Sequence, residues 1–289
     1  MRLTDKWRDY ELLDASNGER LERWGDVILI RPDPQAIFNT KRENPLWKKA
    51  NARYIRSKSG GGYWEKYSNV PDVWSIKYGE LTFNLKPMGF KHTGLFPEQA
   101  VNWDYMSDII KKSDKPFKVL NLFAYTGGAT LACLKAGAEV THVDASKGMV
   151  AWAKDNAVTA GLQDKPVRWL VDDCIKFVER EIRRGKKYDG IVMDPPSYGR
   201  GPGGEVWKLE EEVFGFVEKC AQLLNPDAKF FLINSYTAGL SPSVMEYILG
   251  VTVAKKMGGS LSSDEIGLRV TSTNMVLPCG STAIWKGKD

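Results

Sequence analysis

From residue 98 onward, short apolar runs alternate with segments of helical periodicity. The runs of strand length are Val119–Phe123, Val140–Asp144, Val167–Val171, Gly190–Asp194 and Lys229–Asn234. Helical spacing of apolar residues recurs in Glu98–Lys112, Ala129–Ala136, Gly148–Ala160, Ile175–Arg184 and Leu209–Leu223. Such alternation is typical of βαβ units with parallel pairing. It predicts an α/β fold with a Rossmann-like, doubly wound, mostly parallel sheet, closed by an antiparallel pair from Ile266–Thr273 and Thr282–Lys286.

The first 87 residues show the short runs and turn signals of β-structure instead. The predicted strands are Tyr10–Ala15, Arg20–Gly25, Val27–Pro32, Val73–Tyr78 and Leu81–Leu85. An Asn-Gly pair at positions 17 and 18 is typical of a tight hairpin turn between the first two. The sequence therefore predicts a small β-rich N-terminal module over residues 1–87 and the α/β domain over residues 88–289.

The composition of the chain indicates the cellular environment in which we expect the protein to work. No run approaches the roughly 20 apolar residues that a membrane span needs, and no apolar signal region follows Met1–Trp7. The chain has two His and four dispersed Cys, at positions 133, 174, 220 and 279, without a C-x-x-C pair. We therefore expect a cytoplasmic protein in a reducing environment, with no metal site and no membrane partner.

The net charge of +5 is modest for 289 residues, but the basic residues are unevenly distributed. Between Phe38 and Ser68 only Glu43 and Glu65 oppose a run of basic side chains. These are Lys41, Arg42, Lys48, Lys49, Arg53, Arg56, Lys58 and Lys66, interleaved with Trp47, Tyr54, Tyr63, Trp64 and Tyr67. Cations that neutralise phosphates and rings that stack on bases predict an RNA-binding surface. The alternative is a solvated face whose aromatic residues anchor a small sheet.

A strand, a tight turn and a helix start follow one another at residues 119–134. Gly127 and Gly128 allow close approach of a ligand, and the N–H groups of the first helical turn favour its anionic atoms. The next strand ends in Asp144, where a carboxylate can accept hydrogen bonds from a ribose. The alternative role of Asp144 is to cap the following helix. The turn lacks G-x-G-x-x-G spacing, which argues against a nicotinamide oxidoreductase, so we predict a nucleoside ligand of another kind.

A third strand leads into Asp194-Pro195-Pro196-Ser197-Tyr198, which resembles motif IV of the S-adenosylmethionine-dependent methyltransferases. From about Gly89 to the C-terminus, the chain resembles class I methyltransferases of the bacterial 23S ribosomal RNA type, whose members methylate cytosine C5 or guanine. The stretches that carry this resemblance are HTGLFPEQ, NLFAYTGG, VTHVDAS, LVDDC and DPPSYGRG. The resemblance implies S-adenosyl-L-methionine as the cofactor and 23S ribosomal RNA as the partner.

The resemblance also implies which residues bind the cofactor. Thr126 and the glycine turn would bind its methionine end, and Asp173, or alternatively Asp172, would accept the adenine amino group. One of these acids could instead cap the next helix, and Gln99 could belong to a simple turn. The implied set is Thr93, Gln99, Phe123, Ala124, Tyr125, Thr126, Gly127, Gly128, Asp144, Ala145, Ser146, Asp172, Asp173, Cys174 and Asp194.

Asp194, Pro195, Pro196 and Tyr198 are the implied catalytic residues. Methyl transfer is an in-line displacement that depends on close alignment of the nucleophile with the methyl group. An amine would donate to the Asp194 carboxylate and to the Pro195 carbonyl, which the prolines stiffen, while Tyr198 stacks on a flipped base. The alternative is a Pro-Pro turn with a structural role only. We expect the Gly-rich segment Arg200–Gly204 to form a cationic lid on the acceptor.

The chain differs from the family pattern at one place, and this difference affects which methylated product we expect. C5 methylation of cytosine needs a thiolate that adds to the ring, and relatives carry this Cys after the Pro-Pro pair or at the end of the next strand. This chain has Ser197 at the first place and Asn-Ser-Tyr-Thr at residues 234–237. We therefore expect an RNA methyltransferase that forms an N-methyl product. The alternatives are methylation of a protein side chain or small molecule, and a nucleoside-binding homologue without catalysis.

Overall fold

The computed structural model describes residues 1–57, 61–200, 206–237 and 239–288. The chain divides into two compact units. The α/β unit comprises Met1, Val101–Ile266 and Gly280–Asp289. The β-rich unit comprises Arg2–Ala100 and Gly267–Cys279.

A seven-stranded sheet forms the centre of the α/β unit, in the order β10-β9-β8-β11-β14-β16-β15. Its strands are β8 (Lys118–Leu122), β9 (Glu139–Asp144), β10 (Val167–Val171), β11 (Gly190–Met193), β14 (Phe230–Ser235), β15 (Ser260–Arg269) and β16 (Val276–Lys286). The strands from β10 to β14 in this order pair in parallel, and β16 is antiparallel to β14. The doubly wound, mostly parallel sheet predicted from the sequence is confirmed.

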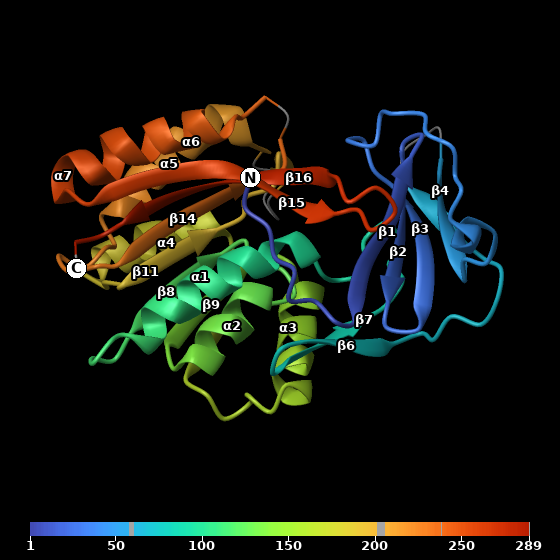
Figure 1. Ribbon diagram of the computed structural model, residues 1–289. Helices are drawn as coiled ribbons and strands as arrows, with labels where there is room; N and C mark the ends of the chain where they lie inside the picture. The colour runs from blue at the N-terminus through green and yellow to red at the C-terminus, as the bar shows by residue number, and fades with distance from the viewer. Residues whose placement is uncertain (58–60, 201–205, 238, 289) are drawn as a thin grey trace. The chain divides into compact units, whose positions relative to one another are not determined.

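Helices cover both faces of this sheet. They are α1 (Ala100–Lys111), α2 (Gly128–Ala136), α3 (Lys147–Thr159), α4 (Cys174–Arg183), α5 (Leu209–Ala221), α6 (Pro242–Leu249) and α7 (Lys255–Met257), with a π-helical turn η3 (Gly250–Ala254). Figure 1 shows α1 and α2 on one side of the sheet and α5 and α6 on the other. Leu120 and Leu122 share a core with Phe216 of α5, whereas Asn121 between them donates to Thr130 of α2. This alternation follows from the two-residue period of a strand.

The β-rich unit contains a five-stranded sheet in the order β1-β2-β3-β4-β5 and a separate hairpin of β6 and β7. Its elements are β1 (Tyr10–Ser16), β2 (Glu19–Trp24), β3 (Val27–Pro32), η1 (Pro45–Lys48), β4 (Ala52–Arg56), β5 (Gly62–Lys66), β6 (Trp74–Tyr78), β7 (Leu81–Leu85) and η2 (Pro97–Gln99). Asn17 and Gly18 have φ angles of +51° and +75°, as the tight hairpin turn between β1 and β2 requires. Strands β4 and β5 arise from the basic segment, for which the sequence predicted no elements.

The division between the units differs from the predicted boundary after residue 87. The segment up to Ala100 belongs to the β-rich unit, where Nη1 of Arg31 donates to the carbonyl of Lys91 at 3.1 Å. The C-terminal excursion Gly267–Cys279 returns to the same unit, where its backbone bonds to β1. Neither of these two segments differs in composition from the sequence around it. The sequence pattern therefore did not indicate that they belong to the β-rich unit.

A short two-stranded sheet follows β11, formed by β12 (Tyr198–Arg200) paired antiparallel with β13 (Val206–Lys208). Residues 201–204 of the predicted cationic lid lie outside the described residues, as do residue 205 and, in the basic segment, Lys58. In the described part of the chain, every helix is too short or too polar to span a bilayer.

Candidate active site

The register of the parallel strands brings the predicted site residues to one edge of the sheet. Leu122 pairs with Val143 and with Met193, and these pair in turn with Leu170 and Ile233. The residues that follow at this level are Phe123, Asp144, Val171, Asp194 and Asn234. This is the carboxyl edge, where doubly wound sheets bind ligands, and the strand order reverses between β8 and β11.

The turn after β8 is left-handed at three positions. The φ angle is +53° at Phe123, +50° at Tyr125 and +86° at Gly127. This conformation costs energy for a residue with a side chain. Hydrogen bonds offset the cost, because the N–H of Phe123 donates to Sγ of Cys174 at 3.3 Å and that of Tyr125 to Oδ2 of Asp144 at 2.8 Å. The N–H groups of Ala124 and Gly127 also donate within the protein, to the carbonyls of Val143 and Ala124 at 3.1 and 3.0 Å, so the turn is closed by its own hydrogen bonds.

The Asp144 carboxylate is fixed by backbone groups on both oxygens. Oδ2 accepts the N–H of Tyr125 and Oδ1 that of Ser146, each at 2.8 Å. Ser146 caps α3 with its hydroxyl, which accepts the N–H of Met149, so the capping alternative for Asp144 is wrong. Burial raises the pKa of Asp144, while the two backbone hydrogen bonds act in the opposite direction. Each carboxylate oxygen retains a further acceptor position, and the group can still bind ribose hydroxyls.

The start of α2 is available to an anionic group. Its N-cap is Gly127, and among the described residues no side chain caps the helix, which leaves first-turn N–H groups as donors. Gly128 is explained by packing, because a Cβ there would lie 2.6 Å from Cζ2 of Trp103. Thr126 is buried, and its carbonyl accepts the side-chain amide of Asn156 at 2.9 Å. Its predicted contact with the cofactor stays a prediction.

The two acids after β10 each have a partner in α4. Asp173 caps this helix, because its carboxylate accepts the N–H of Lys176 at 2.9 Å. Asp172 forms an ion pair with Arg180. The acid that caps the helix is thus Asp173, which was also the preferred candidate for adenine binding. Adenine binding by either acid stays a prediction.

The turn after β11 is held by β13. Nε1 of Trp207 donates to the Pro196 carbonyl at 2.7 Å. The centre of the indole ring lies 5.4 Å from the ring centre of Phe123 and 5.7 Å from that of Phe216. Trp207 was not among the predicted site residues, because a single Trp beyond a Gly-rich stretch gives no signal of this contact.

The same turn leaves polar groups for a substrate. Pro195 is buried, and among the residues that the structure describes nothing donates to its carbonyl. Asp194 precedes it, partly buried, at the end of β11. Tyr198 is 52% exposed, as a ring that stacks on a base would need to be. These positions suit an amine held between a carboxylate and a carbonyl.

The cysteines offer little nucleophilic character. Cys133, Cys174 and Cys220 are buried in the α/β unit, and burial raises the pKa of all three thiols, to about 12 for Cys133. The half-buried Cys279 lies in the β-rich unit, and desolvation raises its pKa as well. Ser197 stands where C5-forming relatives carry a Cys, with its Oγ 2.5 Å from Oγ1 of Thr237. Because the thiolate is the reactive form, thiols with a raised pKa are poor nucleophiles.

Two predicted cofactor contacts, Thr93 and Gln99, lie in the β-rich unit. The Thr93 hydroxyl is buried and bonds to no described residue, whereas its carbonyl accepts the N–H of Lys86 at 3.2 Å. Gln99 is buried at the end of η2. Their contact with the cofactor stays a prediction.

Comparison with known proteins adds to this geometry. Residues 48–240 match the family model described as S-adenosylmethionine-dependent methyltransferase. The chain belongs to this methyltransferase family. It is 36% identical to the S-adenosylmethionine-dependent methyltransferase of Agrobacterium tumefaciens, whose crystal structure gives a TM-score of 0.94 over 99% of this chain and 93% of that one. The cofactor is therefore S-adenosyl-L-methionine.

More distant relatives include large-subunit ribosomal RNA enzymes. The "Ribosomal RNA large subunit methyltransferase K/L" of Shewanella baltica is 28% identical over 240 residues, which are 80% of this chain and 32% of the relative. This methyltransferase thus spans about a third of the length of the curated relatives it matches. A methyltransferase of Streptococcus mutans shares the fold, with a TM-score of 0.74 at 17% identity over 98% of this chain and 76% of that one.

The residues at the sheet edge fit this cofactor. Bound S-adenosylmethionine supplies a methyl group on a sulfonium, which a nucleophile displaces in line. The uncapped start of α2 suits the carboxylate of the methionine part. The Asp144 carboxylate suits the ribose. The protein must also hold the nucleophile in a fixed position. The turn after β11, which Trp207 fixes by its hydrogen bond to the Pro196 carbonyl, is suited to this role.

Replacing Trp207 by Phe should slow methyl transfer without weakening cofactor binding. The substitution keeps an aromatic ring beside Phe123 but removes the N–H that holds the Pro196 carbonyl. Because small displacements of a reacting group are costly, we expect kcat to fall by roughly tenfold to a hundredfold. The free energy of unfolding should fall by only about 0.5–1.5 kcal/mol. Single-turnover kinetics, urea unfolding and calorimetry with S-adenosylhomocysteine measure the three quantities.

Trp285→Phe is a matched control, because Nε1 of Trp285 also donates to a carbonyl, that of Gly258, at 2.7 Å. It should lower stability by a similar amount and leave kcat unchanged. Equal losses of kcat in the two variants would show that Trp207 acts through stability alone.

Proposed function

We propose that this methyltransferase modifies a base of RNA, that its substrate is the 23S RNA of the large ribosomal subunit, and that it methylates nitrogen. The turn after β11 supports nitrogen as the methylated atom, because Asp194 and the Pro195 carbonyl are adjacent acceptors for the N–H groups of an amine. Tyr198, exposed at the same turn, would stack on the flipped base. Pro196 fixes the turn through its bond with Trp207.

The RNA substrate is supported by two observations. The curated relatives from Shewanella baltica and Shewanella frigidimarina are named as large-subunit ribosomal RNA methyltransferases. The basic segment forms η1, β4 and β5 of the β-rich unit. Its Tyr63 and Tyr67 are exposed, as an RNA-binding surface needs, whereas Trp47 and Tyr54 are buried and anchor the sheet instead. Mass mapping of ribosomal RNA from a strain that lacks the gene tests the proposal. One missing methyl group would identify the target, and an unchanged RNA would favour a protein or small-molecule acceptor.

In the proposed cofactor site, Asp144 binds the ribose and the turn from Phe123 to Gly128 binds the methionine part. Asp173 or Asp172 accepts the adenine amino group, beside Cys174. Ala145 and Ser146 border the ribose. The resemblance adds Thr93 and Gln99, whose contact with the cofactor stays a prediction. An enzyme with this site and no membrane-bound substrate is expected to act in the cytoplasm.

The wild-type protein should form no covalent complex with RNA that contains 5-fluorocytosine. C5 methylation passes through a thiolate adduct, and the buried thiols of the α/β unit have raised pKa values. The enzyme, cofactor and labelled RNA are incubated and separated on a denaturing gel. A cytosine C5 methyltransferase treated in parallel serves as the positive control.

A slow-migrating band from the wild type would contradict nitrogen as the acceptor if it disappeared on replacement of one Cys. That Cys would then be the nucleophile, and the product would be 5-methylcytosine.

A further inference from the structure

A cavity of about 330 Å³ lies on the β-rich unit. Its lining residues are Asn17, Glu19, Pro32, Arg42, Arg53, Tyr54, Ile55 and Arg56. Three guanidinium groups against one carboxylate leave this wall positively charged. The volume is at the lower end of the range for small ligand sites, roughly 300–1,000 Å³. Charge and size together suit an anionic group.

Glu19 holds two of the three arginines in place. Nε and Nη2 of Arg53 donate to its two carboxylate oxygens at 2.7 and 3.0 Å. Nη2 of Arg42 donates to Oε2 of the same carboxylate at 2.7 Å. A ligand that binds these guanidinium groups therefore meets side chains that are already ordered, which lowers the entropy cost of binding.

Arg42 keeps donors for a ligand. Its guanidinium carbon lies 4.0 Å from the ring centre of Trp47, and Nη2 also donates to the Ser16 carbonyl at 3.0 Å. Among the described residues, its hydrogen bonds use Nη2 alone. Nε and Nη1 of Arg42 thus remain as single donors to an oxyanion, each with the strength of a charge-assisted hydrogen bond.

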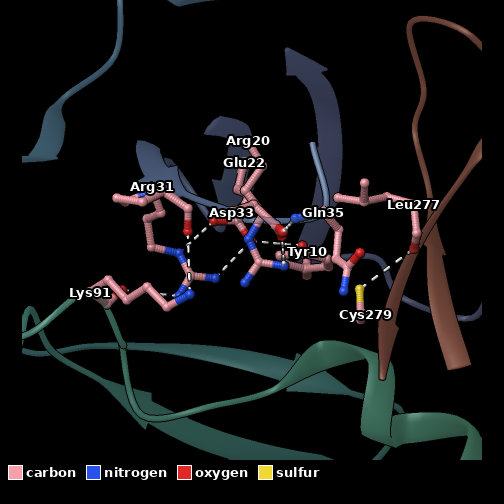
Figure 2. Close-up of polar contacts among 10 residues, drawn as sticks. Tyr10, Arg20, Glu22, Arg31, Asp33, Gln35, Lys91, Leu277 and Cys279 are labelled. Atoms are coloured by element: carbon pink, nitrogen blue, oxygen red, sulfur yellow. Dashed lines mark hydrogen bonds and ion pairs between the residues drawn. The ribbon is translucent and has the colours of Figure 1, made fainter. Parts of the chain in front are cut away.

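The positive potential extends beyond the cavity wall. Nζ of Lys91 donates to the carbonyl of Pro32, a lining residue, at 3.4 Å. Figure 2 shows Lys91 together with Arg20 and Arg31 in one group of polar side chains. The pKa of Lys91 is lowered to about 8, first by burial and then by the positive charges of Arg20, Arg31 and Arg56, although Asp33 opposes them. Glu22 and Asp33 pair with Arg20 and Arg31, so this group adds one net positive charge next to the cavity.

We infer that this cavity binds a backbone phosphate of the RNA substrate through Arg42, Arg53 and Arg56. The inference rests on the proposed function and adds a phosphate site outside the α/β unit. Tyr63 of β5 pairs in register with Ile55 of the cavity wall and is 60% exposed. Its ring can stack on a base next to the bound phosphate.

The test uses the full-length protein and a fluorescein-labelled, single-stranded RNA of mixed sequence. Binding is measured by fluorescence anisotropy at several salt concentrations. The triple variant R42Q/R53Q/R56Q should bind at least roughly tenfold more weakly at low salt. The slope of log K against log salt should fall by about 0.7, because the cavity binds one phosphate and each phosphate contact on a single strand contributes about 0.7.

A matched control removes three exposed lysines of the α/β unit in K165Q/K255Q/K256Q. It changes the net charge equally and should keep nearly the wild-type slope. S-adenosylhomocysteine affinity should be unchanged in both triple variants. If loss of both partners of Glu19 unfolds the protein, Arg56→Gln alone, which keeps both ion pairs of Glu19, should still weaken RNA binding at low salt.

Wild-type affinity and slope in the folded triple variant, or in Arg56→Gln, would overturn the phosphate site and leave the RNA substrate standing. A wild-type protein that binds neither this RNA nor ribosomal RNA would overturn both the site and the proposed function.

Discussion

Replacing Asp194 by Ala should lower turnover about 10²–10³-fold, the usual cost of removing one preorganised polar contact at a reacting centre. Asp194 directly follows β11 at the carboxyl edge. In the proposed reaction its carboxylate orients the acceptor amine so that the nitrogen lone pair points at the methyl carbon. Cofactor affinity should change little, because the carboxylate acts on the nucleophile. Transfer of radiolabelled methyl groups to ribosomal RNA from the gene-deletion strain measures turnover, and calorimetry measures affinity.

Asp194→Asn is the matched variant, since its amide keeps an acceptor oxygen in nearly the same volume. It should retain clearly more activity than Asp194→Ala. A fall in cofactor affinity that matches the fall in turnover would instead place Asp194 against the cofactor. Wild-type turnover in the Ala variant would remove it from the reaction.

The central sheet could be predicted because β8, β9, β11 and β14 are largely buried and therefore appear as apolar runs. The predicted run at 167–171 is β10 itself, and the others differ from β8, β9, β11 and β14 by one residue at each end at most. In contrast, β5 is mostly exposed and shows no apolar pattern. Helix α6 was missed although Ser241 caps it and Pro242 opens it, a signal that the sequence does contain.

That the site residues lie close together could be predicted from the topology of the sheet. Parallel strands end at one edge, so Phe123, Asp144 and Asp194 meet once the strands are identified. The contacts that fix these residues could not be predicted, because they join distant segments. Trp207 on the Pro196 carbonyl and Cys174 on the Phe123 N–H are such contacts. Left-handed backbone at Phe123 and Tyr125 also contradicts local preference and exists only because tertiary hydrogen bonds support it.

Replacing Asp144 by Ala should weaken cofactor binding by about 1.5–3 kcal/mol, the value of a hydrogen bond to a charged group. The substitution has two effects, however. It removes the proposed ribose acceptor, and it frees the N–H groups of Tyr125 and Ser146, which Asp144 holds at 2.8 Å. Calorimetry with S-adenosylhomocysteine gives the total loss, but a loosened turn alone could produce it.

A second ligand separates the two effects. The wild type should bind S-adenosylhomocysteine more tightly than its 2′-deoxyribose counterpart, because the latter lacks one hydroxyl for Asp144. In Asp144→Ala this preference should largely disappear. Because burial raises the pKa of Asp144 and the ionised form is the stronger acceptor, the wild-type preference should also decline with falling pH, earlier than for an ordinary carboxylate. If Asp144→Ala weakens both ligands equally and keeps the preference, Asp144 only shapes the turn and another residue binds the ribose.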